Sequence, residues 1–174
     1  ISIIIPMYNE EESLPYLYDR LTKLSDKIEN YNMEFLFVND GSKDNSLNIV
    51  KAYKKSDERV CYLNLSRNFG KEVAMAAALD YVRGDVVAII DADLQDPPEL
   101  IIDMLKYYEE GYDDVYAKRK SRKGETVLKK FTSHTFYRVL RSVSKVPIQE
   151  DTGDFRLLSR RAVEALKAFP ERQR

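Results

Sequence analysis

The chain has 174 residues, a single cysteine and a formal net charge of −1, from 28 Lys and Arg against 29 Asp and Glu. The length suits one domain with a core of its own, so we expect residues 1–174 to form a single domain. The balanced charge excludes a bulk attraction to nucleic acid, the single cysteine excludes a disulfide framework, and no run reaches the roughly 18 apolar residues of a membrane span.

Short apolar runs rich in β-branched residues alternate with helical patterns in the first part of the chain. These runs predict strands at residues 1–5, 35–38, 60–65 and 86–90. Their lack of polar alternation is typical of strands covered on both faces. Leucines recur at helical spacing between the first two runs, as on the core face of a covering helix. The alternation predicts an α/β fold of three layers, α/β/α, with a mostly parallel central sheet.

The second part of the chain continues the alternation. Asp96 before Pro97-Pro98 predicts an N-cap followed by proline at the first helical position, and Gly111 predicts the end of that helix. The remaining segments predict a strand at 114–118, a basic loop at 118–123, a helix from about 124 to 145, a turn at 152–154, a strand at 155–158 and a helix at 160–169.

An Asp-x-Asp pattern directly follows the apolar run at residues 86–90. Ligands of open parallel sheets bind at the carboxyl ends of the strands, so Asp91 and Asp93 stand where a site is expected. With the Gln95 amide oxygen they form an oxygen cluster suited to a divalent cation, which would neutralise charge on a leaving diphosphate. Two alternatives stay open. The residues could simply shape a turn, or they could form the aspartyl-phosphate of a phosphatase, which normally uses a pattern after the first strand.

Polar residues also follow the first two predicted strands. Asp40 could accept a hydrogen bond from a nucleobase, Tyr8 could lie against the base or ribose, and Glu10 could accept from ribose hydroxyls. Each segment is also compatible with a plain turn ahead of a helix. The sequence therefore predicts a nucleotide site only when these segments are considered together with the Asp-x-Asp pattern.

Together these segments resemble glycosyltransferase family 2 with the GT-A fold, in order and spacing, over nearly the whole chain. The segments that carry this resemblance are Ile3–Glu10, Asn39–Ser42 and Asp91–Asp93. Three longer segments resemble the polyprenyl-phosphate branch of the family, which includes bactoprenol glucosyltransferases and dolichol-phosphate mannose synthases: Ser66–Glu72, Asp91–Pro98 and Asp151–Leu157.

The resemblance implies a role for each matching position. It places these residues on the nucleotide-sugar donor: Pro6, Tyr8, Glu10, Val38, Asp40, Asp91, Ala92 and Arg119. It implies that Mg²⁺ or Mn²⁺ binds to Asp91, Asp93 and Gln95, and that Asp93 and Asp154 are the catalytic residues. Asn39 departs from the family pattern, which more often has Asp there. We expect little loss, because Asp40 is the position that matches the base contact.

The acceptor side of the site is expected in two polar segments. A phosphate acceptor is already largely ionised at neutral pH, since its second pKa is about 6, so no base is required. Asp154 could therefore be a base, orient the acceptor, brace the site or belong to a structural turn. Lys120, Arg122 and Asp151 are expected near the acceptor phosphate, although the basic loop is also compatible with a solvated surface segment.

The resemblance implies an inverting transfer of a hexose from a UDP-sugar, or else a GDP-sugar, to a polyprenyl phosphate. Alternatives are a family 2 transferase acting on a polysaccharide, protein or small molecule, and a non-catalytic nucleotide-sugar-binding module. The implied parent protein works at the cytoplasmic face of the cell membrane and continues into C-terminal transmembrane helices, through which it could form a homo-oligomer. The basic and apolar helix at about 124–145 either packs on the sheet or lies on an anionic membrane surface.

Overall fold

The computed structural model describes residues 1–118 and 152–168. The chain divides into two compact units, Ile1–Tyr116 with Asp154–Arg174, and Ala117–Gly153. All the described helices belong to the first unit. Most of the predicted basic loop and the whole predicted helix at 124–145 lie outside the described residues, and the organisation into a single domain stays a prediction.

A six-stranded sheet forms the centre of the first unit, in the order β3-β2-β1-β4-β6-β5. Its strands are β1 Ser2–Met7, β2 Glu34–Asn39, β3 Val60–Asn64, β4 Val86–Ile89, β5 Asp114–Lys118 and β6 Thr152–Ser159. β1 pairs in parallel with both β2 and β4, and β2 pairs in parallel with β3. β6 is antiparallel to β4. The predicted strands and the mostly parallel sheet are confirmed, but the predicted turn at 152–154 is wrong, because these residues begin β6.

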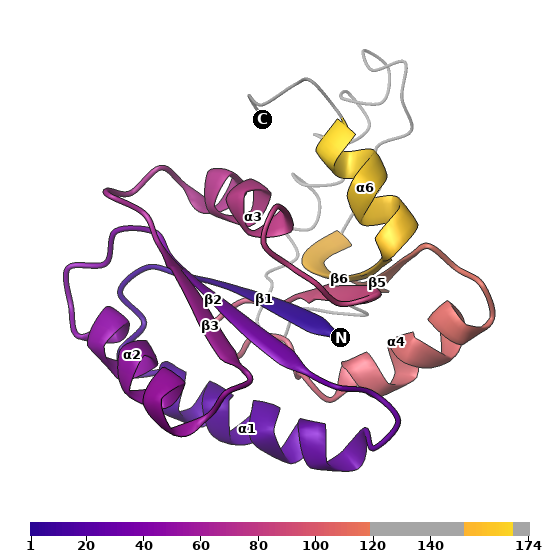
Figure 1. Ribbon diagram of the computed structural model, residues 1–174, viewed down its shortest axis with the longest axis horizontal. Coiled ribbons are helices and arrows are strands. Elements are labelled where there is room, and N and C mark those ends of the chain that lie inside the picture. The colour runs from indigo at the N-terminus through magenta and orange to yellow at the C-terminus, as the bar shows by residue number, and fades with distance from the viewer. Residues whose placement is uncertain (119–151, 169–174) are drawn as a thin grey trace, which may run out of the picture. The chain divides into compact units, whose positions relative to one another are not determined.

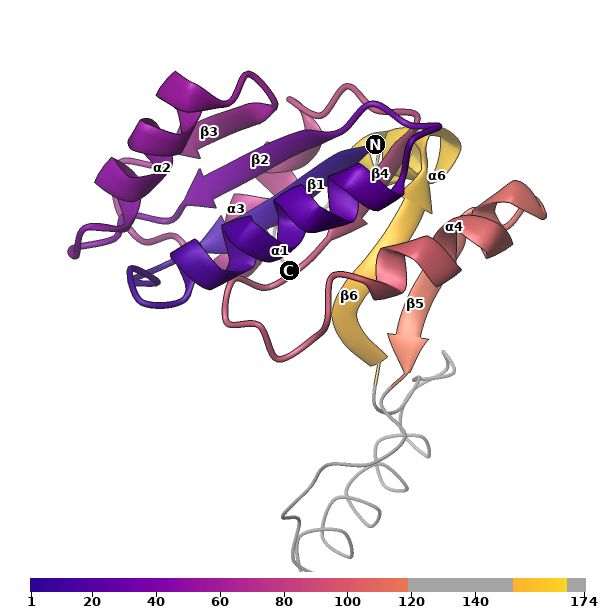
Figure 2. The ribbon, with the colours of Figure 1, turned by 90° about the horizontal axis from the view of Figure 1, so that it is seen from below.

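Helices cover both faces of this sheet, which confirms the three-layer prediction. They are α1 Leu14–Lys27, α2 Ser46–Ser56, α3 Lys71–Leu79, α4 Leu100–Glu109 and α6 Arg160–Ala168. In Figure 1, α1, α2 and α4 lie on one side of the strands and α3 and α6 on the other, and Figure 2 shows the first group from below. Among the described residues, no helix combines the length and apolarity that crossing a bilayer requires.

The core explains why the strand runs lack polar alternation. Every residue of β1 is buried, because helices pack against both of its faces. Ile4 of β1 belongs to a buried cluster with Ala74 of α3 and Val163 of α6. On the opposite side, Leu17 and Leu21 of α1 are fully buried. Burial of each such side chain stabilises the folded state by about 1.5–3 kcal/mol.

The predicted start of the fourth helix is wrong. α4 begins at Leu100, and its N-cap is Glu99 rather than Asp96. Proline disfavours the helical conformation in the residue before it, so Pro98 keeps Pro97 out of the helix. The backbone forms a turn instead, in which the Leu100 N–H donates to the Pro97 carbonyl at 3.1 Å.

The predicted end of α4 at Gly111 is confirmed. Gly111 has φ +99°, a conformation that glycine adopts without the strain of a side chain. The Gly111 N–H donates to the Tyr108 carbonyl, and the Tyr112 N–H donates to the Tyr107 carbonyl. This pair of bonds satisfies carbonyls that the helix itself leaves without partners.

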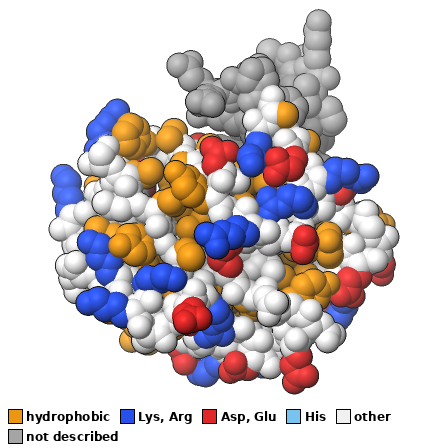
Figure 3. Space-filling model, in the orientation of Figure 1, with side chains coloured by type: hydrophobic (Ala, Val, Ile, Leu, Met, Phe, Trp, Pro, Cys, Tyr) orange, Lys and Arg blue, Asp and Glu red, His pale blue; other side chains and the backbone are white. Residues whose placement is uncertain are grey.

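Charges of both signs are interspersed over the face shown in Figure 3, with hydrophobic side chains in scattered patches between them. No single sign dominates this face. The arrangement agrees with the formal net charge of −1.

A polar network joins α1 to the segment between α2 and β3. Asp57 accepts hydrogen bonds from the Tyr18 hydroxyl at 2.8 Å and from Arg59 Nη2 at 2.8 Å. Tyr18 also stacks on Tyr53, with ring centroids 4.0 Å apart. The Arg59 guanidinium and the Tyr18 hydroxyl lower the pKa of Asp57 to about 2. Burial and the bond to Asp57 raise the pKa of Tyr18 to about 12.

We expect the Asp57→Asn variant to lose about 1–2 kcal/mol of unfolding free energy near neutral pH, because two charge-assisted hydrogen bonds weaken. The folded pKa of Asp57, about 2, lies below its ordinary value of 3.8. Its contribution is therefore complete above about pH 4 and disappears as the pH falls through about 2. Urea unfolding of parent and variant between about pH 2 and pH 7 measures this difference.

Asp103→Asn is the matched control, because Asp103 pairs with Lys106 on the exposed surface of α4. Such a surface pair contributes about 0–1 kcal/mol, so the control should stay close to the parent. A stability difference for Asp57→Asn that does not shrink in acid would contradict the assignment.

Candidate functional site

The carboxyl ends of β1, β2 and β4 lie at one edge of the sheet. Met7 at the end of β1 is paired with Asn39 at the end of β2, and Ile4 is paired with Ile89 of β4. The chain adds β2 and β3 on one side of β1 and then returns to add β4 on the other. Ligands of open α/β sheets bind in the crevice that such a reversal creates. A ligand site is therefore expected among the loops that follow these strands.

The loops after β1 and β2 are joined by reciprocal hydrogen bonds. The Asn9 N–H donates to Ser42 Oγ at 3.0 Å, and the Lys43 N–H donates to Asn9 Oδ1 at 2.8 Å. The Glu10 N–H donates to Ser46 Oγ, in the first turn of α2, at 2.8 Å. Asn9 itself has φ +57°, which Asn tolerates better than most residues. These bonds fix the backbone that presents Glu10.

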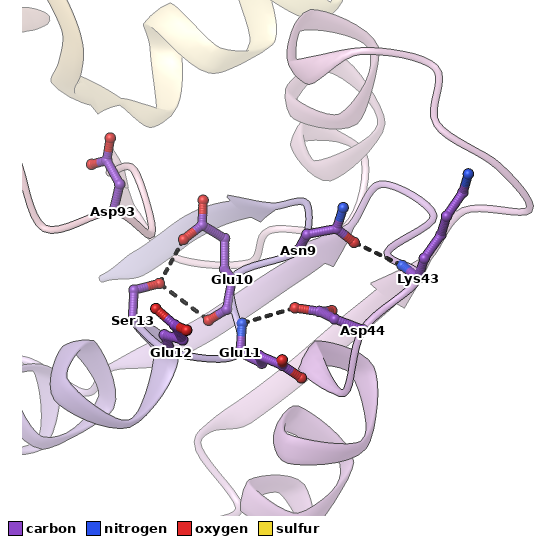
Figure 4. Close-up of a pocket in the computed structure, with 8 residues that line it drawn as sticks. All are labelled: Asn9, Glu10, Glu11, Glu12, Ser13, Lys43, Asp44 and Asp93. Carbon is purple, nitrogen blue, oxygen red and sulfur yellow. Dashed lines mark hydrogen bonds between the residues drawn. The ribbon is translucent and has the colours of Figure 1, made fainter.

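Next to these loops lies an open pocket of about 540 Å³. Figure 4 shows its lining: Asn9, Glu10, Glu11, Glu12, Ser13, Lys43, Asp44 and Asp93. Glu10 Oε2 accepts a hydrogen bond from Ser13 Oγ at 2.6 Å. In this view the carboxylates of Glu10 and Asp93 point to the same side of the pocket. The structure thus brings together one predicted residue from the loop after β1 and one from the loop after β4.

Asp44 braces the far side of this pocket. Its Oδ2 accepts from the Glu11 N–H at 3.0 Å, and its Oδ1 accepts from Ser46 Oγ at 2.6 Å. Burial raises the pKa of Asp44, but the hydrogen bonds from Ser46 and Glu11 outweigh it and leave the pKa below its ordinary value. Asp44 is therefore an anion that holds the loop after β1 on the start of α2.

Asp40 holds a third loop in place. The residue is only 4% exposed, and its two carboxylate oxygens accept the N–H groups of Phe69 and Gly70 at 2.8 and 2.9 Å. A buried carboxylate needs such donors, because an unpaired buried charge is costly. Each oxygen retains a second acceptor direction, so the predicted hydrogen bond from Asp40 to a nucleobase stays a prediction.

Asp91 and Asp93 differ in their surroundings. Asp91 Oδ1 lies 2.5 Å from Lys71 Nζ, and the two side chains are 32% and 35% exposed. Asp93 is exposed and its Oδ1 accepts the Gln95 N–H at 3.0 Å. Ala92 between them is buried. Asp93 shapes a turn, as one alternative expected, and it keeps a second carboxylate oxygen for a ligand.

These oxygens fit a cation that a substrate helps to hold. In the described part of the chain, no three or more His, Cys, Asp or Glu side chains group in a way that could hold a metal by themselves. Mg²⁺ is usually bound by one or two carboxylates together with substrate phosphates. Asp91, Asp93 and the Gln95 amide offer hard oxygen donors of that kind. The metal site therefore stays a prediction that the donor chemistry supports.

The other predicted residues lie partly inside and partly outside the described ranges. Pro6 and Val38 are buried register partners at the ends of β1 and β2, and Tyr8 is 38% exposed. The side chain of Asp154 lies outside the description, although its backbone belongs to β6. The residues outside the described ranges altogether are Arg119, Lys120, Arg122 and Asp151.

Sequence reasoning missed Lys71 and the serines that organise the strand-end loops. Ser42 and Ser46 accept backbone N–H groups from the loop after β1, and Ser13 donates to Glu10. In the sequence, only their position indicated a role, because all of these residues stand in or beside a loop that follows a strand. Which partner each side chain chooses depends on the tertiary fold.

Comparisons with known proteins identify the family of this fold. Residues 2–167 match the family described as glycosyl transferase family 2. A Synechocystis protein named as an uncharacterized glycosyltransferase is 48% identical over 174 residues, covering 100% of this chain and 54% of that protein. The bactoprenol glucosyl transferase of Shigella phage SfX is 43% identical over 172 residues, covering 99% of this chain and 56% of that protein. The chain therefore spans about half the length of these relatives.

A solved structure has the same fold. It is a mannosyltransferase from Pyrobaculum calidifontis in complex with GDP-mannose and Mn²⁺. The TM-score is 0.66 with 24% sequence identity, over 97% of this chain and 47% of that one. At this identity the likeness establishes the fold.

Gly41 gives a test of how tightly the strand-end loops pack. It has φ +70°, and a Cβ there would lie 2.4 Å from the Arg67 carbonyl carbon and 2.6 Å from the Asn68 nitrogen. We expect Gly41→Ala to lose more than about 2 kcal/mol of unfolding free energy, because backbone strain and a backbone clash add together.

Gly111→Ala is the control. Gly111 also has a positive φ, +99°, but a Cβ there would meet nothing within 4 Å. It should cost only the conformational strain, about 1–2 kcal/mol. Chemical unfolding of both variants measures the comparison, and equal losses would show that the loops after β2 and β3 do not constrain each other.

Proposed function

Because this chain belongs to glycosyl transferase family 2, we propose that it transfers a hexose from a nucleotide-sugar to a polyprenyl phosphate. The observation that carries the proposal is the pocket that Glu10 and Asp93 line together, where the order of the strands reverses between β1 and β4. This is the place where an open α/β sheet binds its ligand.

The donor would lie across the ends of the three strands. In the proposed arrangement Tyr8, Glu10 and Asp40 hold the nucleoside, with Pro6 and Val38 forming the buried floor beneath it. Their positions at the ends of β1 and β2 support this assignment. The diphosphate would then extend toward the loop after β4, where Asp91, Ala92 and Asp93 stand, and toward Arg119.

A divalent cation, Mg²⁺ or Mn²⁺, would be held by Asp91, Asp93 and Gln95. When bound, it supplies positive charge that stabilises the nucleotide diphosphate as a leaving group. The exposed Asp93 carboxylate, with one oxygen already oriented by the Gln95 N–H, supports this assignment. The Pyrobaculum mannosyltransferase of the same fold was solved with Mn²⁺.

The acceptor proposal rests on the relatives named as bactoprenol glucosyl transferases. An ionised phosphate oxygen of the lipid would attack the anomeric carbon of the sugar while the bond from that carbon to the β-phosphate oxygen breaks. The configuration at the anomeric carbon would invert. No proton has to leave the acceptor, because its phosphate is already largely ionised at neutral pH. Asp154 would orient the acceptor, and Lys120, Arg122 and Asp151 would surround its phosphate. Transfer would take place at the cytoplasmic face of the membrane that contains the lipid.

We expect Asp93→Asn to reduce transfer about a hundredfold or more while the fold stays intact, because a carboxylate that holds the cation loses its charge. The measurement is transfer of labelled glucose from UDP-glucose to undecaprenyl phosphate in detergent with Mn²⁺, together with circular dichroism and unfolding of both proteins.

Asp103→Asn is again the control, because Asp103 forms an exposed pair with Lys106 on α4 and has no part in the proposed site. It should transfer glucose at the parental rate. Parental turnover by Asp93→Asn with Mg²⁺ and with Mn²⁺ would remove Asp93 from the metal site.

The donor is tested by thermal shift. With Mn²⁺ present and the nucleotide at about a hundred times its Kd, UDP-glucose should stabilise the folded chain by about 2.7 kcal/mol, which raises Tm by about 5–10 °C. GDP-mannose at the same concentration as UDP-glucose should give the smaller shift, and chelation of the metal should remove most of either shift. A shift that survives chelation unchanged would show that the cation does not hold the donor, and a larger shift with GDP-mannose would reverse the donor assignment.

A further inference from the structure

Lys71 occupies a position that the proposed function leaves unused. It is the first residue of α3, and its Nζ lies 2.5 Å from Asp91 Oδ1 at the end of β4. The residues just before it are bonded to Asp40 at the end of β2. Since β1 lies between β2 and β4, residues 69–71 connect the ends of β2 and β4 across β1. Lys71 is thus a cation at the edge where the donor would bind.

The backbone that presents Lys71 is held rigidly. Asp40 accepts both N–H groups that precede it, from Phe69 and Gly70. Gly70 has φ +96° and ψ 151°, a combination essentially restricted to glycine. The side chain of Lys71 is 35% exposed, so a ligand in solution can reach it.

The position of Lys71 conflicts with the usual preference of a helix. Helix N-termini carry a partial positive charge and favour acidic residues, yet Lys71 places an ammonium group there. In the structure the negative charge of Asp91 offsets this positive charge. Departures from local preference concentrate at functional sites, and an incoming anion would complement both the helix end and the ammonium.

The Asp91 carboxylate cannot bind the Lys71 ammonium and a divalent cation with full strength at the same time. The ammonium of Lys71 uses Asp91 Oδ1, and the proposed function assigns the same carboxylate to a divalent cation. When the divalent cation takes Asp91, the ammonium loses part of its attraction to that carboxylate. A phosphate that the divalent cation binds would then bring a second anion to the strand ends beside the ammonium. Lysine is a common phosphate ligand because it acts as a compact point charge.

We propose that Lys71 is a phosphate-binding residue of this site, held on Asp91 until a metal and a phosphate arrive. The inference rests on the proposed function and adds a residue to it. The phosphate could belong to the donor diphosphate or to the lipid acceptor. Both present the same chemistry to an ammonium group, and separate binding and transfer measurements distinguish them.

The test compares Lys71→Gln and Lys71→Arg with the control Lys23→Gln. Lys23 forms a similar pair, 2.6 Å from Asp19 Oδ2, on the exposed surface of α1. Calorimetry measures the Kd of Mn²⁺ alone, and the Kd of UDP, of GDP and of inorganic pyrophosphate with Mn²⁺ present. Steady-state transfer measures the KM for undecaprenyl phosphate.

We expect Lys71→Gln to weaken pyrophosphate binding about tenfold or more. If the donor supplies the phosphate, UDP affinity falls by a similar factor. If the acceptor supplies it, UDP affinity is unchanged and the KM for undecaprenyl phosphate rises instead. Mn²⁺ alone should bind several-fold more tightly, because Asp91 is no longer shared. Lys71→Arg should keep most of the phosphate affinity, and Lys23→Gln should match the parent throughout.

The proposal is overturned if Lys71→Gln binds pyrophosphate as the parent does, or if it binds Mn²⁺ more weakly. A parent that binds pyrophosphate but neither UDP nor GDP would refute the proposed function and leave the Lys71 comparison decisive. A parent that binds no pyrophosphate would refute the assignment of Lys71.

Discussion

The buried carboxylate of Asp40 is the interaction on which the geometry of the strand-end loops depends. An anion that is only 4% exposed must find hydrogen-bond donors, because burying it unpaired is costly. Asp40 finds them in the N–H groups of Phe69 and Gly70, about thirty residues further along the chain. The same arrangement brings Gly41 so close to the Arg67 backbone that no side chain fits. One charged group at the end of β2 therefore sets the course of the loop after β3 and the start of α3.

The sheet and the loops have different roles in the structure. The central strands β1, β2 and β4 are almost entirely buried and form a rigid platform, and their polar side chains are confined to the strand ends. The polar side chains of the loops bond mainly to one another's loops, as Ser46 and Asp44 do with the loop after β1. A site supported in this way is positioned by strands and helix starts rather than by free loops, which favours a fixed geometry for ligands. Glu10 and Asp93 reach the same pocket because β1 and β4 are neighbours.

The sequence allowed the elements to be predicted better than the contacts between them. Apolar runs indicated each described strand to within a few residues, and leucine spacing indicated the helix between β1 and β2, since local periodicity reports burial directly. The bounds of α3, Lys71–Leu79, were not predicted. The insertion of β6 between β4 and β5 could not be predicted this way, because strand order depends on long-range packing. The pair between Lys71 and Asp91 was equally inaccessible, as nothing in a spacing of twenty residues tells which side chains meet. The N-cap at Asp96 failed because the effect of Pro98 on Pro97 outweighed the capping preference. The strand-end positions of Asp40, Asp91 and Asp93 were predicted, whereas their partners were not.

The order of the last two strands bears on how such a chain can diversify. The chain leaves the sheet at the end of β5 and re-enters it at the start of β6, and these two strands are neighbours. The chain between them therefore departs from and returns to neighbouring strands, while the antiparallel register of β6 on β4 is set by residues 156–159. When the two ends of a segment are fixed, the entropic cost of closing it rises only slowly as the segment becomes longer. Evolution or protein design can thus replace the segment between β5 and β6 with another. The strand pairing of the sheet that carries the Asp-x-Asp turn would stay the same. Recombination at these two strand ends is a physically economical route to chimaeric enzymes.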